Sequence, residues 1–380
     1  MNKFLLREVS NSNIIQELTQ IGFDESYKLV ACDKFLYKNI KIFDLSIAQA
    51  NILKQTALIF GADCAVNKNV VTGNCEKTDV ILCGSYSQLK KIANKIKKQP
   101  FNLCELGSEI LNILSKASEK KTKIVGILNI TPDSFSDGGL YFDIKSAQKH
   151  LVKLIEDGAD CIDIGAETTK PFSSPTSCQE QIERLKPILE FIKKENISTP
   201  ISIDTRSSNV ADFVLNNGIQ IINDVSGFDF DSNMPKIIAK HSAKVIIQHS
   251  QGAPEVMQKK PSYNNVVEDI FLHLYKKINF AKENGISDII IDPGIGFGKT
   301  QLDNFNILNQ IEELCSLGSP IMIGLSRKSF LGAERNENDL KDSLSLAISY
   351  PLMQKGIDYL RVHNVKLHVE LLKLVKSIPN

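Results

Sequence analysis

The chain has 380 residues, 42% hydrophobic and 23% charged, a balance typical of a soluble globular protein with room for one large domain and a smaller one. The net charge of +1 gives no reason to expect a nucleic-acid or anionic-membrane surface, and no apolar stretch approaches the roughly 18 residues of a membrane span. The first residues lack the apolar core and cleavage site of a secretory signal, so we expect a cytoplasmic protein.

Residues 1–114 alternate helix-like and strand-like patterns, which predicts a small α/β extension of unknown role. Apolar spacing predicts a helix over 46–60, a short apolar run predicts a strand over 79–82, and 85–98 has the pattern of an amphipathic helix with a solvated lysine face. No catalytic motif occurs there. The charged, small-residue stretch 115–122 predicts a linker.

Between residues 123 and 380, short β-branched apolar runs alternate with amphipathic helical segments. Runs that are apolar throughout predict parallel strands buried on both faces. Eight such runs in a region of this length predict a (β/α)₈ TIM barrel. An open doubly wound sheet would usually carry G-x-G-x-x-G after its first strand, and no such motif occurs there. The predicted strands are 123–130, 161–165, 200–204, 219–225, 243–249, 288–292, 320–325 and 359–363.

Each predicted strand ends in polar or charged residues. In a barrel these ends meet at one mouth, where barrel enzymes keep their chemistry. One Asp after a strand is more often a helix cap than a catalyst, and Asp224 and Glu167 are the weakest candidates, but eight polar ends together favour a site. The residues are Asn129, Glu167, Asp204, Asn223, Asp224, Gln248, His249, Asp292, Ser326, Arg327, Lys328, Arg361 and His363.

One group among these residues suits a flat heterocycle. Asp204, Asn223 and Asp292 supply acceptors and one amide, which match the ring N–H and exocyclic amine of a pterin or purine. Lys328 can donate to a ring oxygen or nitrogen. These four side chains predict a heterocycle site.

The second group is cationic and comes from the last two strands, the usual phosphate corner of a barrel. Arg327, Lys328, Arg361 and His363 are suited to bind phosphate. The segment 324–329 is also expected to begin a helix whose free N–H groups favour an anion. A structural role for Arg361, paired with a barrel carboxylate, stays open.

Three loops on the mouth side complete the predicted site. The run DPGIGFGKT at 292–300 lacks Walker spacing. Its glycines are expected to let the backbone approach a flat ligand, with Phe297 over the ring. The polar turns at 131–140 and 171–177 are predicted to be lids that exclude water.

Seven motifs in chain order together resemble the dihydropteroate synthase family. They cover nearly all of residues 123–380 and leave the first 114 outside the family's core pattern. The motifs are GILNITPDSFSDGG at 126–139, DIGAETTKP at 163–171, SIDT at 202–205, INDVSG at 222–227, DPGIGFGK at 292–299, GLSRKSFLG at 324–332 and RVHNV at 361–365.

The resemblance implies a transferase of folate biosynthesis in which para-aminobenzoate displaces pyrophosphate from 6-hydroxymethyl-7,8-dihydropterin diphosphate. It implies Mg²⁺ as cofactor, with Asn129 meeting the metal and the diphosphate. It also implies small-molecule substrates, a homodimer and a target of sulfonamides. The implied pterin residues are Asp204, Asn223, Asp292, Lys328 and Gln248, and the implied phosphate residues are Arg361 and His363.

For the second substrate, the resemblance implies an aminobenzoate pocket at Thr169, Lys170, Pro171 and Phe297, with Ser329 meeting its carboxylate. It places lids at 131–140 and 167–178, and the first lid contains Asp133, Phe135 and Asp137.

Four positions depart from the family's usual residues: Lys170 stands for Arg, Gln248 for Met, Asn364 for Asp, and Ser250 also differs. We expect altered affinity and not lost activity. A corrinoid-type pterin methyltransferase is one alternative, although it needs no diphosphate pocket. A non-catalytic pterin-binding paralogue is another, although every inferred diphosphate ligand is present.

The eight cysteines form no C-x-x-C pair. Structural zinc needs closely paired ligands, and disulfide frameworks belong to small secreted chains. We therefore expect buried free thiols.

Overall fold

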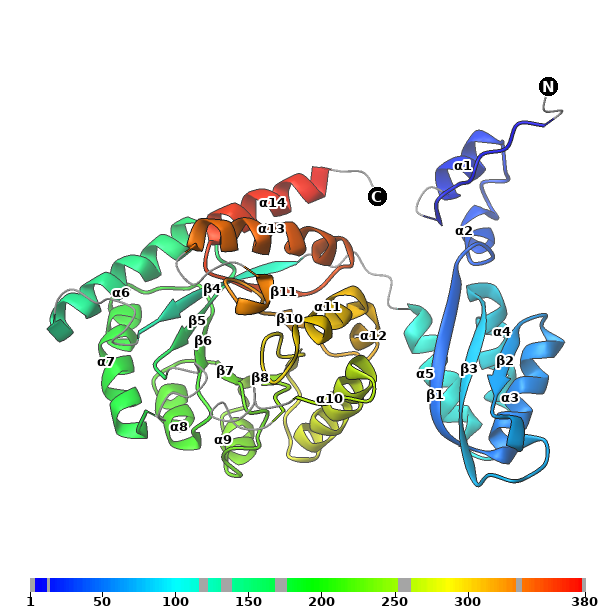
Figure 1. Cartoon of the computed structure of the whole chain (residues 1–380), viewed down its shortest axis with the longest axis horizontal. Helices are drawn as coiled ribbons and strands as arrows, with labels where there is room; N and C mark the ends of the chain where they lie inside the picture. Colours follow the sequence, from blue (N-terminus) through cyan, green and yellow to red (C-terminus); the bar gives the residue numbers. More distant parts are fainter. Residues whose placement is uncertain are drawn as a thin grey trace. The chain divides into compact units, whose positions relative to one another are not determined.

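The computed structural model describes residues 4–11, 14–115, 122–130, 139–167, 176–251, 261–332 and 337–377. The chain divides into two compact units, Met1–Ser118 and Glu119–Pro379 (Figure 1), and each has an apolar core of its own. The expected linker at 115–122 lies, except for its two end residues, outside the described part.

The N-terminal unit is a three-stranded antiparallel sheet of order β1-β3-β2 with helices packed on it. Burial alternates along β3, so one sheet face is covered by α3, α4 and α5. The elements are α1 (Ile14–Gln20), α2 (Lys28–Cys32), β1 (Tyr37–Ser46), α3 (Ile47–Ile59), β2 (Asp63–Val66), η2 (Lys68–Val70), β3 (Lys77–Ser85), α4 (Tyr86–Ile96) and α5 (Leu103–Ser115).

Local sequence signals set the ends of these helices. Ser46 and Ser85 cap α3 and α4, each with a glutamine three residues later that completes a capping box. Gly107 lets α5 approach α4, because an added Cβ would lie 2.6 Å from the carbonyl oxygen of Ala93. The helices expected at 46–60 and 85–98 and the strand expected at 79–82 are all present.

The second unit is an eight-stranded parallel barrel with helices around it, and it confirms the predicted (β/α)₈ fold (Figure 1). The order is β10-β11-β4-β5-β6-β7-β8-β9. A parallel bridge between Ile291 and Ile321 closes the ring. The strands are β4 (Lys123–Asn129), β5 (Cys161–Gly165), β6 (Ile201–Asp204), β7 (Ile221–Asp224), β8 (Lys244–Gln248), β9 (Ile289–Asp292), β10 (Met322–Ile323) and β11 (Tyr359–Val362).

β5, β9 and β10 are buried along their whole length and the other strands along at least half of theirs, as expected for a sheet between a filled interior and a helical layer. The surrounding helices are α6 (Gly139–Glu156), α7 (Cys178–Lys194), α8 (Ser208–Asn216), α9 (Met234–Lys240), α10 (Val266–Glu283), α11 (Gln301–Asn309), α12 (Ile311–Cys315), α13 (Asn338–Gln354) and α14 (Val365–Ser377).

The prediction that a helix begins at 324–329 is wrong. Only a three-residue 3₁₀ turn, η4 (Ser329–Leu331), follows β10, and the next α-helix is α13. Arg327 has φ 58° and Gly332 has φ 82°, and such left-handed residues interrupt a right-handed helix.

All eight cysteines are free thiols, as expected, but only Cys32, Cys64 and Cys161 are buried, and Cys104 is exposed. No helix within the described ranges is long and apolar enough to cross a bilayer.

Candidate active site

One row of the barrel mouth runs across four neighbouring strands. Asn129 lies opposite Gly165, Gly165 opposite Asp204, and Asp204 opposite Asn223. A Cβ added at Gly165 would lie 3.3 Å from Oδ1 of Asn129 and 4.0 Å from Oδ2 of Asp204. Gly165 therefore leaves room between Oδ1 of Asn129, which the resemblance assigned to Mg²⁺ and the diphosphate, and Oδ2 of Asp204, which it assigned to the pterin.

Asp163 lies two residues before Gly165, on the interior side of β5, and is fully buried. Its Oδ1 accepts a hydrogen bond from Oγ of Ser202 at 2.6 Å. Its Oδ2 accepts from Nδ2 of Asn223 at 3.0 Å and from Nε of Arg361 at 2.6 Å. Asp163 therefore links three strands. The sequence analysis missed it, although an acid inside the apolar run CIDIG was a usable signal.

Arg361 joins two carboxylates. Besides Asp163, its Nη2 donates to Oδ2 of Asp204 at 3.1 Å, so the structural pairing left open for this arginine is present. A buried cation needs such partners, since the desolvation cost is otherwise uncompensated. Burial raises the pKa of Asp204, and the nearby Asp163 adds to this, while Arg361 opposes it.

Asn223 has one satisfied and one unsatisfied end. Its amide nitrogen donates to Asp163, but no donor among the described residues reaches its buried Oδ1. A buried acceptor without a partner costs about 1–3 kcal/mol. This oxygen is therefore matched to a donor that arrives with a ligand.

Asp292 and Gln248 face each other across β9 and β8. Oδ1 of Asp292 accepts from the amide of Gly294 at 2.7 Å, and burial raises the pKa of this carboxyl. Gln248 is 5% exposed, and its Nε2 has only a long contact of 3.5 Å to the carbonyl of Val225. The amide at 248 is thus weakly bound.

Lys299 organises the glycine-rich loop after β9, a role that the sequence analysis did not assign. Its buried Nζ donates to the carbonyls of Gly294 at 2.9 Å and Phe297 at 2.8 Å, and lies 3.1 Å from Nδ1 of His249. Burial lowers its pKa to about 7. Gly294 has φ 67°, and a Cβ there would lie 1.9 Å from the carbonyl oxygen of His249, so only glycine fits.

Lys328 reaches across the mouth from β10 to this loop. Its Nζ donates to the carbonyl of Ile295 and lies 4.5 Å from the ring centroid of Phe297. A Cβ added at Gly324 would lie 3.9 Å from this Nζ and 3.8 Å from the Arg361 side chain, so both cations lie beside this glycine. Burial lowers the pKa of Lys328 to about 8.

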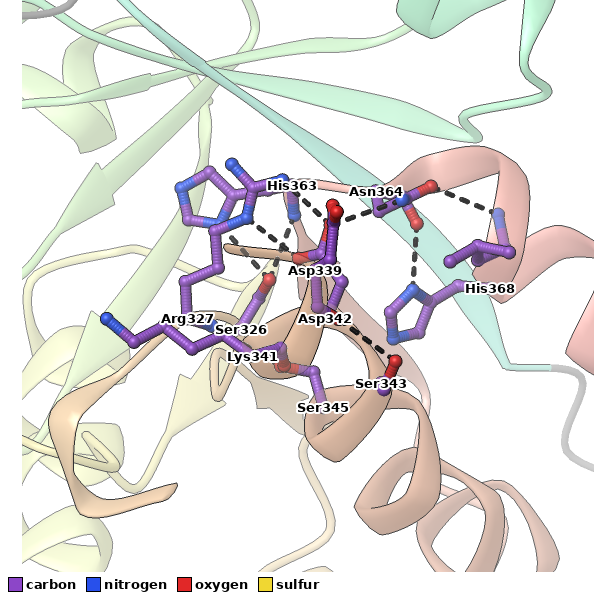
Figure 2. A network of polar contacts seen from close by, with 11 residues as sticks. Ser326, Arg327, Asp339, Lys341, Asp342, Ser343, Ser345, His363, Asn364 and His368 are labelled. Atoms are coloured by element: carbon purple, nitrogen blue, oxygen red, sulfur yellow. Dashed lines mark hydrogen bonds and ion pairs between the residues drawn. The ribbon is translucent and has the colours of Figure 1, made fainter. Parts of the chain in front are cut away.

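The remaining expected cations are bound to the scaffold (Figure 2). Arg327 makes two hydrogen bonds to Asp342 of α13, at 2.7 and 2.8 Å. Nδ1 of His363 lies 3.1 Å from Oγ of Ser326. Burial, with Arg327 and Arg361 nearby, lowers the pKa of His363 to about 3. His363 is therefore a neutral imidazole here and not the expected cation.

Some predicted residues lie apart from this cluster. Ser329 is exposed in η4. Asp224 accepts from Ser226 and Phe228 and stabilises its own turn. Glu167 is paired with Arg206 at 3.0 Å. Outside the described residues lie Asp133, Phe135 and Asp137 of the first lid, and Thr169, Lys170 and Pro171 of the aminobenzoate pocket.

Comparison with known proteins finds similar sequences and structures for the barrel unit. A family model described as pterin binding enzyme matches residues 125–363. The dihydropteroate synthase of Clostridium beijerinckii is 40% identical over 266 residues, which are 69% of this chain and 94% of that protein. The structure of the Xanthomonas albilineans dihydropteroate synthase with 7,8-dihydropteroate has a TM-score of 0.61 at 32% identity, and covers 69% of this chain and 96% of that one.

A third relative extends the likeness beyond the barrel. The probable bifunctional folylpolyglutamate synthase/dihydropteroate synthase of Haloferax volcanii is 33% identical over 350 residues, or 84% of this chain. This share exceeds the 69% matched by the Clostridium protein, so the likeness reaches into the N-terminal unit. The match spans only 41% of the Haloferax protein.

Proposed function

The chain belongs to the pterin binding enzyme family, and from that premise we propose that it is a dihydropteroate synthase. As a transferase of folate biosynthesis, it joins the pterin methylene carbon to the amine nitrogen of para-aminobenzoate and releases pyrophosphate. The carbon–oxygen bond to the diphosphate breaks, the carbon–nitrogen bond forms, and the amine loses one proton.

The unpartnered Oδ1 of Asn223 carries this proposal. It lies beside Asp204 in register, and both can accept from the N–H groups of a pterin. Burial raises the pKa of Asp204 and of Asp292. The pterin ring brings N–H donors, and it gains positive charge as the carbon–oxygen bond to the diphosphate breaks. Both effects stabilise the ionised forms of these two carboxyl groups. Lys328 supplies the donor on the opposite side.

Neighbouring residues fit the leaving group. Arg361 carries a fixed charge, and His363 offers a neutral ring beside it. Arg361 lies on β11, which is the neighbour of β4, and His363 directly follows β11. Interactions that grow as charge develops on the departing oxygen accelerate bond breaking. No nucleophilic side chain is required for this displacement.

Mg²⁺ is part of the proposal. No cluster of three or more His, Cys, Asp or Glu residues suited to a metal occurs in the described part of the chain, but Mg²⁺ commonly uses one or two protein oxygens together with water and phosphate. Oδ1 of Asn129, with Asp204 across Gly165, provides such a donor set. Bound there, the ion would neutralise charge on the diphosphate.

A direct assay tests the function. Incubation with the pterin diphosphate, para-aminobenzoate and Mg²⁺ is expected to release pyrophosphate and dihydropteroate in equal amounts. Asn223→Leu should lower kcat/KM for the pterin diphosphate by about 10- to 100-fold, because a lost hydrogen bond in a closed site costs roughly 1–3 kcal/mol.

Asn216→Leu, at an exposed position near the end of α8, is the matched control and should have no effect. Absence of pyrophosphate release from the wild-type protein would contradict the proposal. It would favour a pterin-dependent methyltransferase or a pterin-binding protein without synthase activity.

We further propose a cytoplasmic homodimer. Eight free thiols suit a reducing compartment. The exposed leucines Leu340 on α13 and Leu367 and Leu374 on α14 offer apolar surface to a second copy. Sedimentation of the wild type and of Leu374→Lys tests the dimer, and a wild-type monomer would contradict it.

A further inference from the structure

Helix α13 carries a carboxylate that joins two segments of the barrel mouth. Asp342 is 5% exposed, and its two oxygens accept from Nε and Nη2 of Arg327 at 2.7 and 2.8 Å. The amide of Asn364 donates to Oδ2 at 3.2 Å, as Figure 2 shows. One side chain therefore holds both the segment after β10 and the turn after β11.

The contact with Arg327 fixes the backbone that leads to Lys328. Arg327 has φ 58°, a left-handed conformation that non-glycine residues rarely adopt. Its amide donates to Oγ of Ser345 at 3.3 Å, so both the side chain and the main chain of Arg327 are held by α13. Lys328 follows in an extended conformation and reaches the carbonyl of Ile295. The direction of Lys328 thus depends on the turn at Arg327.

The contact with Asn364 fixes the other segment. Oδ1 of Asn364 accepts from the amide of Leu367 at 3.3 Å, at the start of α14. The carbonyl oxygen of Asn364 lies 2.8 Å from Nδ1 of His368, whose Nε2 lies 3.2 Å from Oγ of Ser349 on α13. Asn364 is therefore tied to α13 by two routes, and His363 directly precedes it.

The charge on Asp342 suits this role. Burial alone would raise the pKa of this carboxyl, but hydrogen bonds from Arg327 and Asn364 outweigh it and lower the pKa. The side chain is therefore ionised at neutral pH, and a charge-assisted bidentate pair is both stronger and more directional than a neutral contact.

We propose that Asp342 is a positioning residue that sets the directions of Lys328 and of the Arg361–His363 segment through Arg327 and Asn364, without touching substrate. The inference rests on the proposed function, which assigns Lys328, Arg361 and His363 to the pterin diphosphate. It places Arg327 in the supporting scaffold and not among the phosphate ligands that the sequence suggested.

An exchange of identities tests the proposal, since Asp342 and Asn364 are in contact. Asp342→Asn should lower kcat/KM for the pterin diphosphate by about 100-fold, the cost of a small misplacement at a reacting centre. The double variant Asp342→Asn/Asn364→Asp restores a carboxylate–amide contact between the two residues but not the charged pair with Arg327, so it should recover part of this loss. KM for aminobenzoate should change little in either protein.

A matched control removes a carboxylate from another helix. Asp212 of α8 accepts from Lys240 at 2.9 Å and contacts His241 at 2.8 Å, and Asp212→Asn should leave kcat/KM unchanged. Equilibrium binding of the pterin diphosphate, measured by calorimetry, provides a readout that does not need turnover. If the wild type binds this ligand but does not turn it over, the synthase assignment fails while the positioning test remains valid.

Two results would overturn the proposal. One is an Asp342→Asn protein that has only a lower Tm, with wild-type kcat/KM and pterin affinity. The other is an exchange variant as defective as the single variant. If Asp342→Asn does not fold, Asn364→Asp carries the test, because it places two carboxylates in contact. Pterin affinity should then fall as rising pH ionises both, and wild-type affinity at every pH would also overturn the proposal.

Discussion

The two units of the chain differ most in what their interiors contain. The N-terminal unit buries an almost wholly apolar core built from β1–β3 and α3–α5. The barrel buries an apolar layer of the same kind, but its interior also holds Asp163, Asn223, Asp292 and Lys299. Burying charge is costly unless every group has a partner. A cluster of buried ionisable groups at one end of a fold is therefore a better guide to function than the fold is.

Removing the central carboxylate of the barrel should have the largest effect. Asp163→Ala leaves Arg361 and Asn223 with one partner fewer, and breaking a buried pair costs about 3–5 kcal/mol. We expect the barrel to unfold at lower denaturant and activity to be lost. Asp163→Asn, which keeps the shape, should cost less stability. Unchanged unfolding of Asp163→Ala would show that Asp204 alone satisfies Arg361.

A core truncation in the N-terminal unit should separate stability from activity. Leu82 on β3 is fully buried, and Leu82→Ala should destabilise that unit by about 2–5 kcal/mol. We expect a lower first unfolding transition and unchanged kcat/KM. Its neighbour Ile81 is 46% exposed, so Ile81→Ala is the control and should change little. A drop in barrel activity with Leu82→Ala would show that the two units are coupled.

Lys299 should contribute to the pH dependence of the free energy of unfolding. The pKa of Lys299 is about 7 in the folded chain, against 10.5 for an unperturbed lysine. Between these values the unfolded state binds more protons, so this group makes stability rise as pH rises from 7 to 10.5. Lys299→Met should flatten that part of the stability–pH curve. Denaturant titrations at several pH values measure the slope, and an identical slope in both proteins would show that Lys299 is charged when folded.

The smallest effect is expected at Gln248. Its amide has one long contact, to Val225, so Gln248→Met should change stability by less than about 1.5 kcal/mol and retain or improve turnover. Assay of the variant beside the wild type measures this. A large loss of activity would show that the amide has a role of its own.

The strand ends were predictable from the sequence because apolar runs followed by polar residues are local patterns. Asp204, Asn223, Asp292, Lys328 and Arg361 were found in this way. Residues that act within the barrel or from outside it were not. Asp163 lies inside a strand, and Asp342 lies on a helix, so neither follows the end of a predicted strand.

The left-handed turn at Arg327 could not be predicted either, because contacts with α13, which is distant in sequence, hold this residue. Local sequence patterns therefore identified the residues at the barrel mouth, while tertiary contacts determined which of the cationic side chains are directed toward a ligand. The neutral state of His363 has the same origin, since it follows from burial beside two arginines.

The strands of the barrel are not paired equally well all the way round the ring. β10 has two residues, and among the described residues β9 pairs with this side of the ring through the isolated Ile291–Ile321 bridge, where the amide of Ile291 donates to the carbonyl of Pro320 at 2.9 Å. Asp292 and Lys328 stand on opposite sides of this seam. Transient local opening between β9 and β10 would move Asp292 and Lys328 apart while the other strands stay paired. Hydrogen exchange at the amide of Ile291 would therefore report directly on opening of the barrel mouth at this point.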